Sequence, residues 1–145
     1  MMLSPHFALS EFLVSETAAR EGIDNTPSPE IIEQLKRTAA LLEEVRTLLG
    51  GQPIIICSGY RCLELNRAIG SSDTSQHIQG QAADFTCPGY GTPLQIAEAI
   101  YAANPPIEFD QLIHEFDSWV HISWGDDCRM MCLTINESGT NYGLA

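Results

Sequence analysis

The hydrophobic positions of this chain follow a helical period in the first third and β-type runs in the last third. Residues 29–49 repeat apolar side chains on one helical face, and Ser28 and Pro29 suit the N-cap and first position of a helix. Gly50-Gly51 is a typical helix end. We therefore predict a helix of about 30 Å, with a buried face formed by Ile31, Leu35, Leu42, Val45 and Leu49.

Shorter helices are predicted on either side of this long one. Ser10 is expected to cap a piece over residues 11–14, and a second piece runs from Ser15 or Glu16 to Arg20. Further helices are expected over residues 61–68 and after Thr92. The capping box Thr92-Pro93-Leu94-Gln95 starts the last of these, and its predicted buried face consists of Ile96, Ile100 and Tyr101.

The predicted strands are mostly in the second half of the chain. Residues 53–57 are wholly apolar and predict a buried strand. Further strands are expected over residues 81–86, 109–115, 119–124 and 130–135, followed by a polar tail. Helices first and antiparallel strands later predict an α+β fold, with N-terminal helices packed on a small, mainly antiparallel sheet. Without repeats or a linker, residues 1–145 are expected to form one domain.

The candidate chemistry lies in the stretch from Ser75 to Asp84. His77 and Asp84 are seven residues apart, and Gly80 lets the backbone between them turn tightly. Imidazole and carboxylate are both good zinc ligands, and a catalytic zinc site takes three protein ligands and leaves one position for water. His121, in a strand-like run, is the candidate third ligand.

The pattern Ser75-x-His77-x-x-Gly80-x-Ala82-x-Asp84, followed by Trp119-x-His121, resembles the zinc D-alanyl-D-alanine carboxypeptidases and related peptidoglycan endopeptidases. These include D,D-dipeptidases and many phage endolysins, and they share a core with the hedgehog signalling domain. The resemblance extends over nearly the whole chain, through Ser58-Gly59-Tyr60-Arg61 with Asn66 and through the opening residues 3–12. It implies a bound zinc ion with His77, Asp84 and His121 as ligands.

The resemblance also implies an acid three residues before the last histidine, where this chain has Ser118. Glu115 and Asp117 are the nearest carboxylates, and Glu115 is the preferred general base. A two-residue turn at 117–118 would place Glu115 opposite Val120, facing away from His121. A bulge or a longer loop would bring Glu115 to the face of His121, and otherwise Asp117 or His114 becomes the candidate.

Arg61, Ser75 and Trp119 complete the predicted site. Arg61 could bind a substrate carboxylate or the developing oxyanion, or it could hold the turn through an ion pair. Ser75 could bind the substrate backbone or cap the loop. Trp119 is expected to line the cleft.

Composition limits the partners. A net charge of −12 argues against nucleic acid and against an anionic membrane surface. No run approaches the length of about 20 apolar residues that a membrane span needs, and residues 1–6 lack the features of a signal peptide. We therefore expect a cytoplasmic monomer that could reach the cell wall at lysis.

The five cysteines allow a competing metal site. Cys57 and Cys62 could join Cys128 and Cys132 in a four-thiolate zinc site, because their spacings are close to those of structural sites. The other interpretation is free thiols, as is common in a reducing compartment.

Taken together, the sequence predicts a zinc metallopeptidase that hydrolyses peptidoglycan stem peptides, as a carboxypeptidase or an endopeptidase of the endolysin type. An enzyme acting on a free D,D-dipeptide is the second enzymatic hypothesis. The non-enzymatic alternative is a zinc-containing domain without catalysis, for example a binding or structural component of a phage, and Ser118 is the residue that keeps it open.

Overall fold

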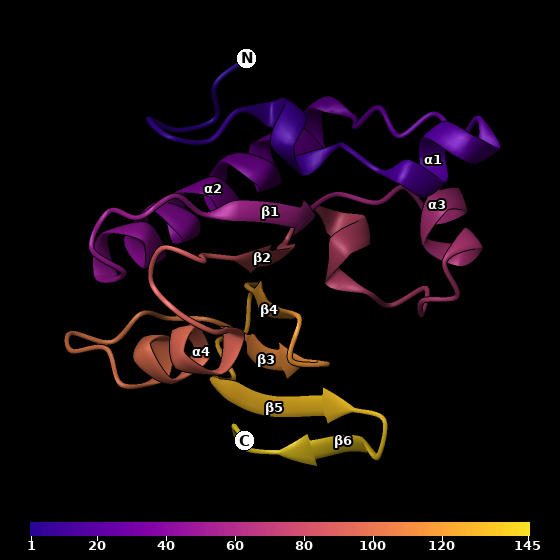
Figure 1. Ribbon diagram of the computed structural model, residues 1–145. Helices are drawn as coiled ribbons and strands as arrows, with labels where there is room; N and C mark the ends of the chain where they lie inside the picture. The colour runs from indigo at the N-terminus through magenta and orange to yellow at the C-terminus, as the bar shows by residue number, and fades with distance from the viewer.

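A six-stranded sheet with helices packed against it forms the α+β fold of this chain (Figure 1). The computed structural model describes residues 1–145. In chain order the elements are η1 (Leu9–Phe12), α1 (Glu16–Glu21), α2 (Pro29–Leu48), β1 (Ile55–Ser58), α3 (Leu63–Ala68), η2 (Gln76–Gln79), β2 (Ala82–Thr86), α4 (Pro93–Tyr101), β3 (Gln111–Glu115), β4 (Trp119–Ser123), β5 (Met131–Asn136) and β6 (Gly139–Tyr142).

The sheet has the strand order β1-β2-β4-β3-β5-β6. Neighbouring strands are antiparallel, except for the parallel pair β3 and β5. The predicted mainly antiparallel sheet is confirmed. The sheet is assembled from segments far apart in the chain, so that β2 lies beside β4 and brings residues 82–85 next to residues 120–123.

The two faces of the sheet have different neighbours. Alternate residues of the central strands, including Phe85, Leu112, Val120 and Ile122, enter one hydrophobic core together with side chains from α2 and α4. Because side chains alternate along a strand, the residues between them point to the opposite face. That opposite face carries Asp84 and His121, which are cross-strand neighbours.

Most predicted helix starts are confirmed at the level of single hydrogen bonds. The hydroxyls of Ser15, Ser28 and Thr92 accept bonds from backbone N–H groups of the first turns of α1, α2 and α4. The Ser10 cap was wrong, because η1 begins two residues earlier, at Leu9 after Ala8. There the Glu11 carboxylate accepts a hydrogen bond of 2.7 Å from the Ala8 N–H instead.

Two predicted burial patterns were wrong. Ile55 is 53% exposed, because β1 lies at the edge of the sheet. Tyr101, the last residue of α4, is 67% exposed, although Ile100 beside it is buried. The predicted polar tail contains a further strand, β6, which pairs with β5.

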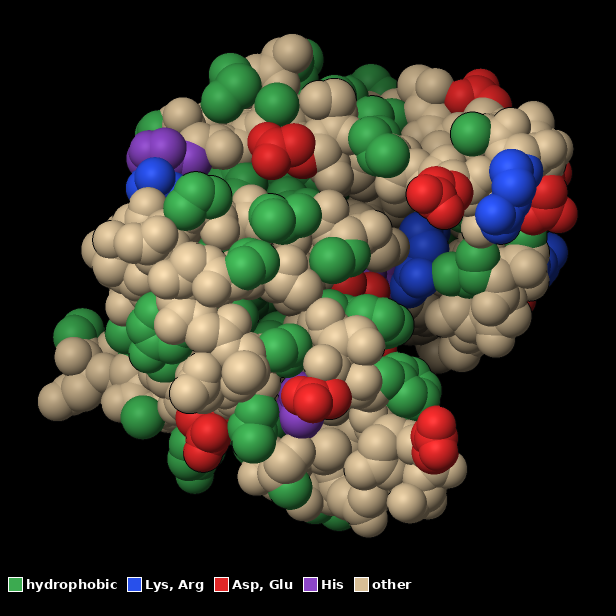
Figure 2. All heavy atoms as spheres, in the orientation of Figure 1, with side chains coloured by type: hydrophobic (Ala, Val, Ile, Leu, Met, Phe, Trp, Pro, Cys, Tyr) green, Lys and Arg blue, Asp and Glu red, His purple; other side chains and the backbone are tan.

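The face of the molecule drawn in Figure 2 carries scattered acidic side chains and few basic ones, as the composition predicts. It is hollowed between the helical part above and the strands below, and a basic side chain lies recessed there. None of the helices has the length and apolar character needed to cross a bilayer.

Candidate metal centre

Three buried side chains converge on the sheet face opposite α2 and α4. His77 comes from η2, Asp84 from β2 and His121 from β4. The residues are 1%, 7% and 7% exposed, respectively. One donor atom from each lies within 4.8 Å of the other two.

The short helix η2 presents His77 because both of its ends are fixed. The hydroxyl of Ser75 accepts a hydrogen bond of 3.2 Å from the His77 N–H. At the other end Gly80 adopts a left-handed conformation with φ 71°. A Cβ on Gly80 would lie 3.2 Å from Ile31 and Leu35 of α2, so glycine suits both the turn and the close approach to α2. Ser75 therefore has the capping role that the sequence left open.

The His77 imidazole is oriented by a backbone carbonyl. Its Nδ1 lies 2.6 Å from the Gly59 carbonyl oxygen, which can only accept, so the assigned tautomer carries its proton on Nδ1. Burial lowers the pKa of His77, although Asp84 works in the opposite direction. The neutral ring then directs the lone pair of Nε2 at Asp84 Oδ2, 3.3 Å away. Two facing lone pairs repel unless a cation lies between them, and a metal ion would meet that need.

His121 approaches the same carboxylate from the neighbouring strand. Its Nδ1 lies 2.8 Å from Asp84 Oδ1. Burial is the largest single effect and disfavours the charged imidazole, but the hydrogen bond with Asp84 and the charges of Asp84 and Glu115 together raise the pKa of His121. Burial likewise opposes ionisation of Asp84, yet the two imidazoles hold the pKa of this carboxyl well below its usual range. An ionised carboxylate between two imidazoles is a set of donors that fits zinc.

The four-thiolate hypothesis was wrong. His77, Asp84 and His121 form the one group of three or more histidine, cysteine or acidic side chains whose donor atoms converge. All five cysteines are free, and Cys57 and Cys128 are exposed. The alternative of free thiols therefore describes these residues.

Glu115 lies on the same face of the sheet as His121. The register pairs Glu115 with Trp119 and Ile113 with His121, so three residues, 116–118, connect β3 and β4. Phe116 and Asp117 adopt positive φ values of 52° and 51°, which close this longer loop. Glu115 Oε1 lies 3.9 Å from His121 Nδ1. The longer loop, not the two-residue turn, is present.

The environment of Glu115 favours a carboxyl that can hold a proton. Burial raises its pKa, and the nearby negative charge of Asp84 raises it further, against the opposing effects of His121, Trp119 and Arg61. The indole Nε1–H of Trp119 donates a hydrogen bond of 3.0 Å to Glu115 Oε2. This bond fixes one carboxylate oxygen and leaves the other on the side of His121.

Asp117 and His114 lie apart from the three converging donors. His114 pairs with Val120 and so points to the other face of the sheet. Its Nε2 lies 3.0 Å from Asp117 Oδ1, and the Asp117 side chain is 79% exposed. Of the three candidates for the base, the structure brings only Glu115 to the converging donors.

Arg61 follows β1 and lies beside the same centre. Its backbone N–H donates to the His77 carbonyl oxygen at 3.2 Å. Burial lowers the pKa of its guanidinium, and the charges of Asp84 and Glu115 partly offset this effect. The buried Nε has no hydrogen-bond partner, and the side chain forms no ion pair, so it does not hold the turn in that way. A largely buried cation without a partner is a candidate ligand for an anionic group.

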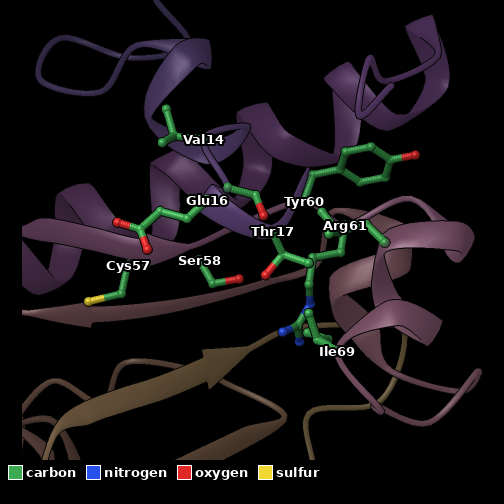
Figure 3. Close-up of a pocket in the computed structure, with 10 residues that line it drawn as sticks. Val14, Glu16, Thr17, Cys57, Ser58, Tyr60, Arg61 and Ile69 are labelled. Atoms are coloured by element: carbon green, nitrogen blue, oxygen red, sulfur yellow. The ribbon is translucent and has the colours of Figure 1, made fainter. Parts of the chain in front are cut away.

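A pocket of about 410 Å³ adjoins the centre. Arg61 and Ser58 line it on the side of β1, and residues 14–17 line the other side (Figure 3). A bulge at Cys57 changes the register of β1, so that Ser58 lies opposite Asp84. The pocket and the three converging donors are therefore neighbours, although the donors themselves do not line it.

The supporting roles of two residues, Gly59 and Gln76, were not predicted. The carbonyl of Gly59 orients His77. The amide of Gln76 donates to Asp110 Oδ2 at 2.9 Å and to the Trp124 carbonyl oxygen at 3.0 Å, which ties η2 to the sheet. In the sequence, the position of Gln76 next to His77 was the signal for such a role, but the hydrogen-bond partners of Gln76 are 34 and 48 residues away in the chain.

Two imidazoles, one carboxylate and a further acid alongside make up the set of side chains found in zinc hydrolases. The sequence model of the family described as Peptidase M15 matches residues 5–123. The chain belongs to this peptidase family. The comparison with curated proteins found no match.

Proposed function

We propose that this protein is a zinc-dependent peptidase that hydrolyses peptide bonds in peptidoglycan stem peptides, as a carboxypeptidase or an endopeptidase. The observation that carries the proposal is the buried convergence of His77, Asp84 and His121. Family membership supports the peptidase activity. The peptidoglycan substrate rests on the resemblance of the ligand motif to enzymes of cell-wall peptides.

In this proposal His77, Asp84 and His121 hold the metal. A zinc ion there would polarise the scissile carbonyl and make a water nucleophilic at neutral pH. The protein fixes the three donors before the metal arrives, through the Gly59 carbonyl on His77 and through the β2–β4 register. Little rearrangement is then needed for binding.

Glu115 is the proposed general base and acid. Its Oε1 is free to accept a proton from the attacking water, and the same group can then protonate the leaving amine. Its raised pKa makes it a better proton acceptor than an ordinary surface carboxylate. Arg61 is proposed to bind a substrate carboxylate or the carbonyl oxygen as it gains negative charge. A substrate contact of Ser75 remains a prediction, beside its capping bond.

The position of Glu115 supports an active enzyme over the alternative of a zinc-containing domain without catalysis. That alternative depended on Ser118, where the acid of related enzymes is expected. Glu115 reaches the face of His121 from the neighbouring strand, so a carboxylate is present beside the donors despite Ser118.

The test is digestion of purified peptidoglycan and of synthetic stem peptides with zinc-loaded protein, followed by mass spectrometry. We expect peptide fragments that are absent when the metal is removed with a chelator and that return when zinc is added. Stoichiometric zinc without any cleavage of cell-wall peptides would contradict the proposed function and favour the domain without catalysis.

A further inference from the structure

The pocket beside the centre is lined by one acidic and one basic side chain. Glu16 and Arg61 are the charged residues among its lining. Neither forms an ion pair. Glu16 is exposed, and in Figure 3 it extends over Cys57 while Arg61 extends toward the strands. Two opposite charges held apart in one pocket can bind a ligand that carries both signs.

Asn25 links the two chain segments that carry these charges. The Asn25 amide nitrogen donates to the carbonyl oxygens of Leu13, at 3.1 Å, and Tyr60, at 3.0 Å. Its amide oxygen accepts a bond of 2.8 Å from the Cys62 N–H. One side chain thus joins the segment before Glu16 to the segment around Arg61. The two sides of the pocket are therefore held at one distance.

The remaining lining suits the methylene groups of a ligand. Val14, Leu65 and Ile69 supply apolar surface to the lining of the pocket. The Ser58 hydroxyl forms no hydrogen bond within the protein and lies on the side of Arg61. The volume of about 410 Å³ falls in the range of small-molecule sites, about 300–1,000 Å³.

We infer that this pocket binds a peptide segment with a free carboxylate and a free ammonium group, and that Glu16 selects the ammonium. The inference rests on the proposed function, because stem peptides contain both groups: D-glutamate linked through its side chain keeps a free carboxylate, and the diamino acid after it keeps a free amine. That amine is lost when the peptide is cross-linked. The preferred substrate is therefore a stem peptide that is not cross-linked at its diamino acid.

The test compares L-Ala-γ-D-Glu-L-Lys-D-Ala-D-Ala with the same peptide acetylated on the lysine amine. An exposed ion pair contributes modestly, so we expect the free amine to lower KM about two- to fivefold in the wild type. Glu16→Gln should remove this preference. Glu21→Gln, an exposed residue of the same helix that does not line the pocket, should retain it.

Equal kcat/KM for both peptides in the wild type, unchanged in Glu16→Gln, would overturn the inference while leaving the peptidase activity established. If the wild type cuts neither peptide, the proposed function fails, and calorimetric binding of the two peptides to the zinc-loaded protein decides the inference separately. Tighter binding of the free amine that Glu16→Gln abolishes would support it. Equal binding, or none, would overturn it.

Discussion

Two polar side chains at the centre, those of His77 and Glu115, each have one hydrogen bond that fixes them and one atom left facing the centre. His77 uses Nδ1 on the Gly59 carbonyl oxygen and keeps Nε2 toward Asp84. Glu115 uses Oε2 on Trp119 and keeps Oε1 toward His121. Because the fixing bonds come from outside the converging group, the atoms that face the centre are oriented in advance.

The Glu115 carboxylate is expected to carry the proton transfer. Glu115→Gln keeps the shape and removes the base, so turnover should fall about 10²- to 10⁴-fold, the usual size of general acid–base catalysis. Zinc content should remain unchanged, because Glu115 is not among the converging donors. Peptide hydrolysis and metal analysis on the same sample measure both quantities.

Asp117→Asn is the matched control for that substitution. It changes a carboxylate two residues away that contacts His114 on the other face of the sheet. We expect nearly full activity. An inactive Asp117→Asn with an active Glu115→Gln would show that Asp117 is the base.

Trp119 is predicted to be a positioning residue for Glu115. Its indole bond lowers the pKa of Glu115, against the larger effect of burial, so losing it should raise that pKa further. In Trp119→Phe, which keeps an aromatic ring next to Phe116, the acidic limb of the kcat/KM profile should move to higher pH. A lower kcat/KM with an unmoved acidic limb would show that Trp119 has only a packing role.

At the scale of elements, short segments place the centre on a sheet that the long helix supports. The turn after β1 carries the Gly59 carbonyl, and η2 carries His77. Gly59 lies against η1 so closely that a Cβ would be 2.7 Å from the Cα and the carbonyl oxygen of Phe12. The position of η1 is thereby coupled to the orientation of His77.

Gly59→Ala is expected to destabilise the protein and weaken zinc binding together. The contact is with backbone, so the cost should be about 1–3 kcal/mol, the range for overpacking. Gly89→Ala is the control, because the close atom there, 2.6 Å away, is the end of the flexible Gln52 side chain. Thermal unfolding and zinc titration of both variants test this, and a stable Gly59→Ala with unchanged zinc affinity would contradict it.

The sequence predicted the elements with a strong period or a clear cap. The 20-residue helix α2, with its Ser28 cap, is an example of both. The sequence could not predict the side of the sheet on which Glu115 lies, because this side depends on the length of the loop between β3 and β4. That loop is closed by positive φ values at Phe116 and Asp117. Phenylalanine rarely adopts that conformation, and aspartate adopts it in only a minority of cases, so the sequence did not indicate this loop.

Weak local patterns account for the other failures. β6 has only polar, glycine and tyrosine residues and is fully exposed, so it lacks the alternation that marks a strand. The motif residues of the candidate centre were visible in the sequence, whereas its supporting contacts were not. Gln76 and Asp110, for example, meet only because η2 packs against the start of β3.

At the scale of the whole molecule, the two faces of the sheet have separate roles. One face packs against α2 and α4 and forms the core, and the other holds the polar centre. Asp110 connects distant parts, because it binds Gln76 of η2 and both Nε and one terminal nitrogen of Arg129. Its carboxylate therefore links the centre to the segment before β5.

Asp110 predicts a specific loss of stability in acid. The hydrogen bond from Arg129 is the largest of the effects that lower its pKa below the unfolded value of about 3.9. The contribution of the ionised Asp110 carboxylate to folding stability is therefore fully present above about pH 4, and it is lost as the pH falls through the lower pKa of the folded state. In Asp110→Asn the stability should be lower near neutral pH and should decline less between about pH 4 and 2. Denaturant unfolding at each pH measures the free energy of unfolding. An identical decline of this free energy with falling pH in wild type and variant would contradict the prediction.

The zinc content of the purified wild type, of His77→Ala and of Cys132→Ser decides whether His77 belongs to a metal site. We expect one zinc per chain in the wild type and in Cys132→Ser, and none in His77→Ala, because His77 belongs to the converging donors and Cys132 does not. Stoichiometric zinc that persists in His77→Ala would contradict it.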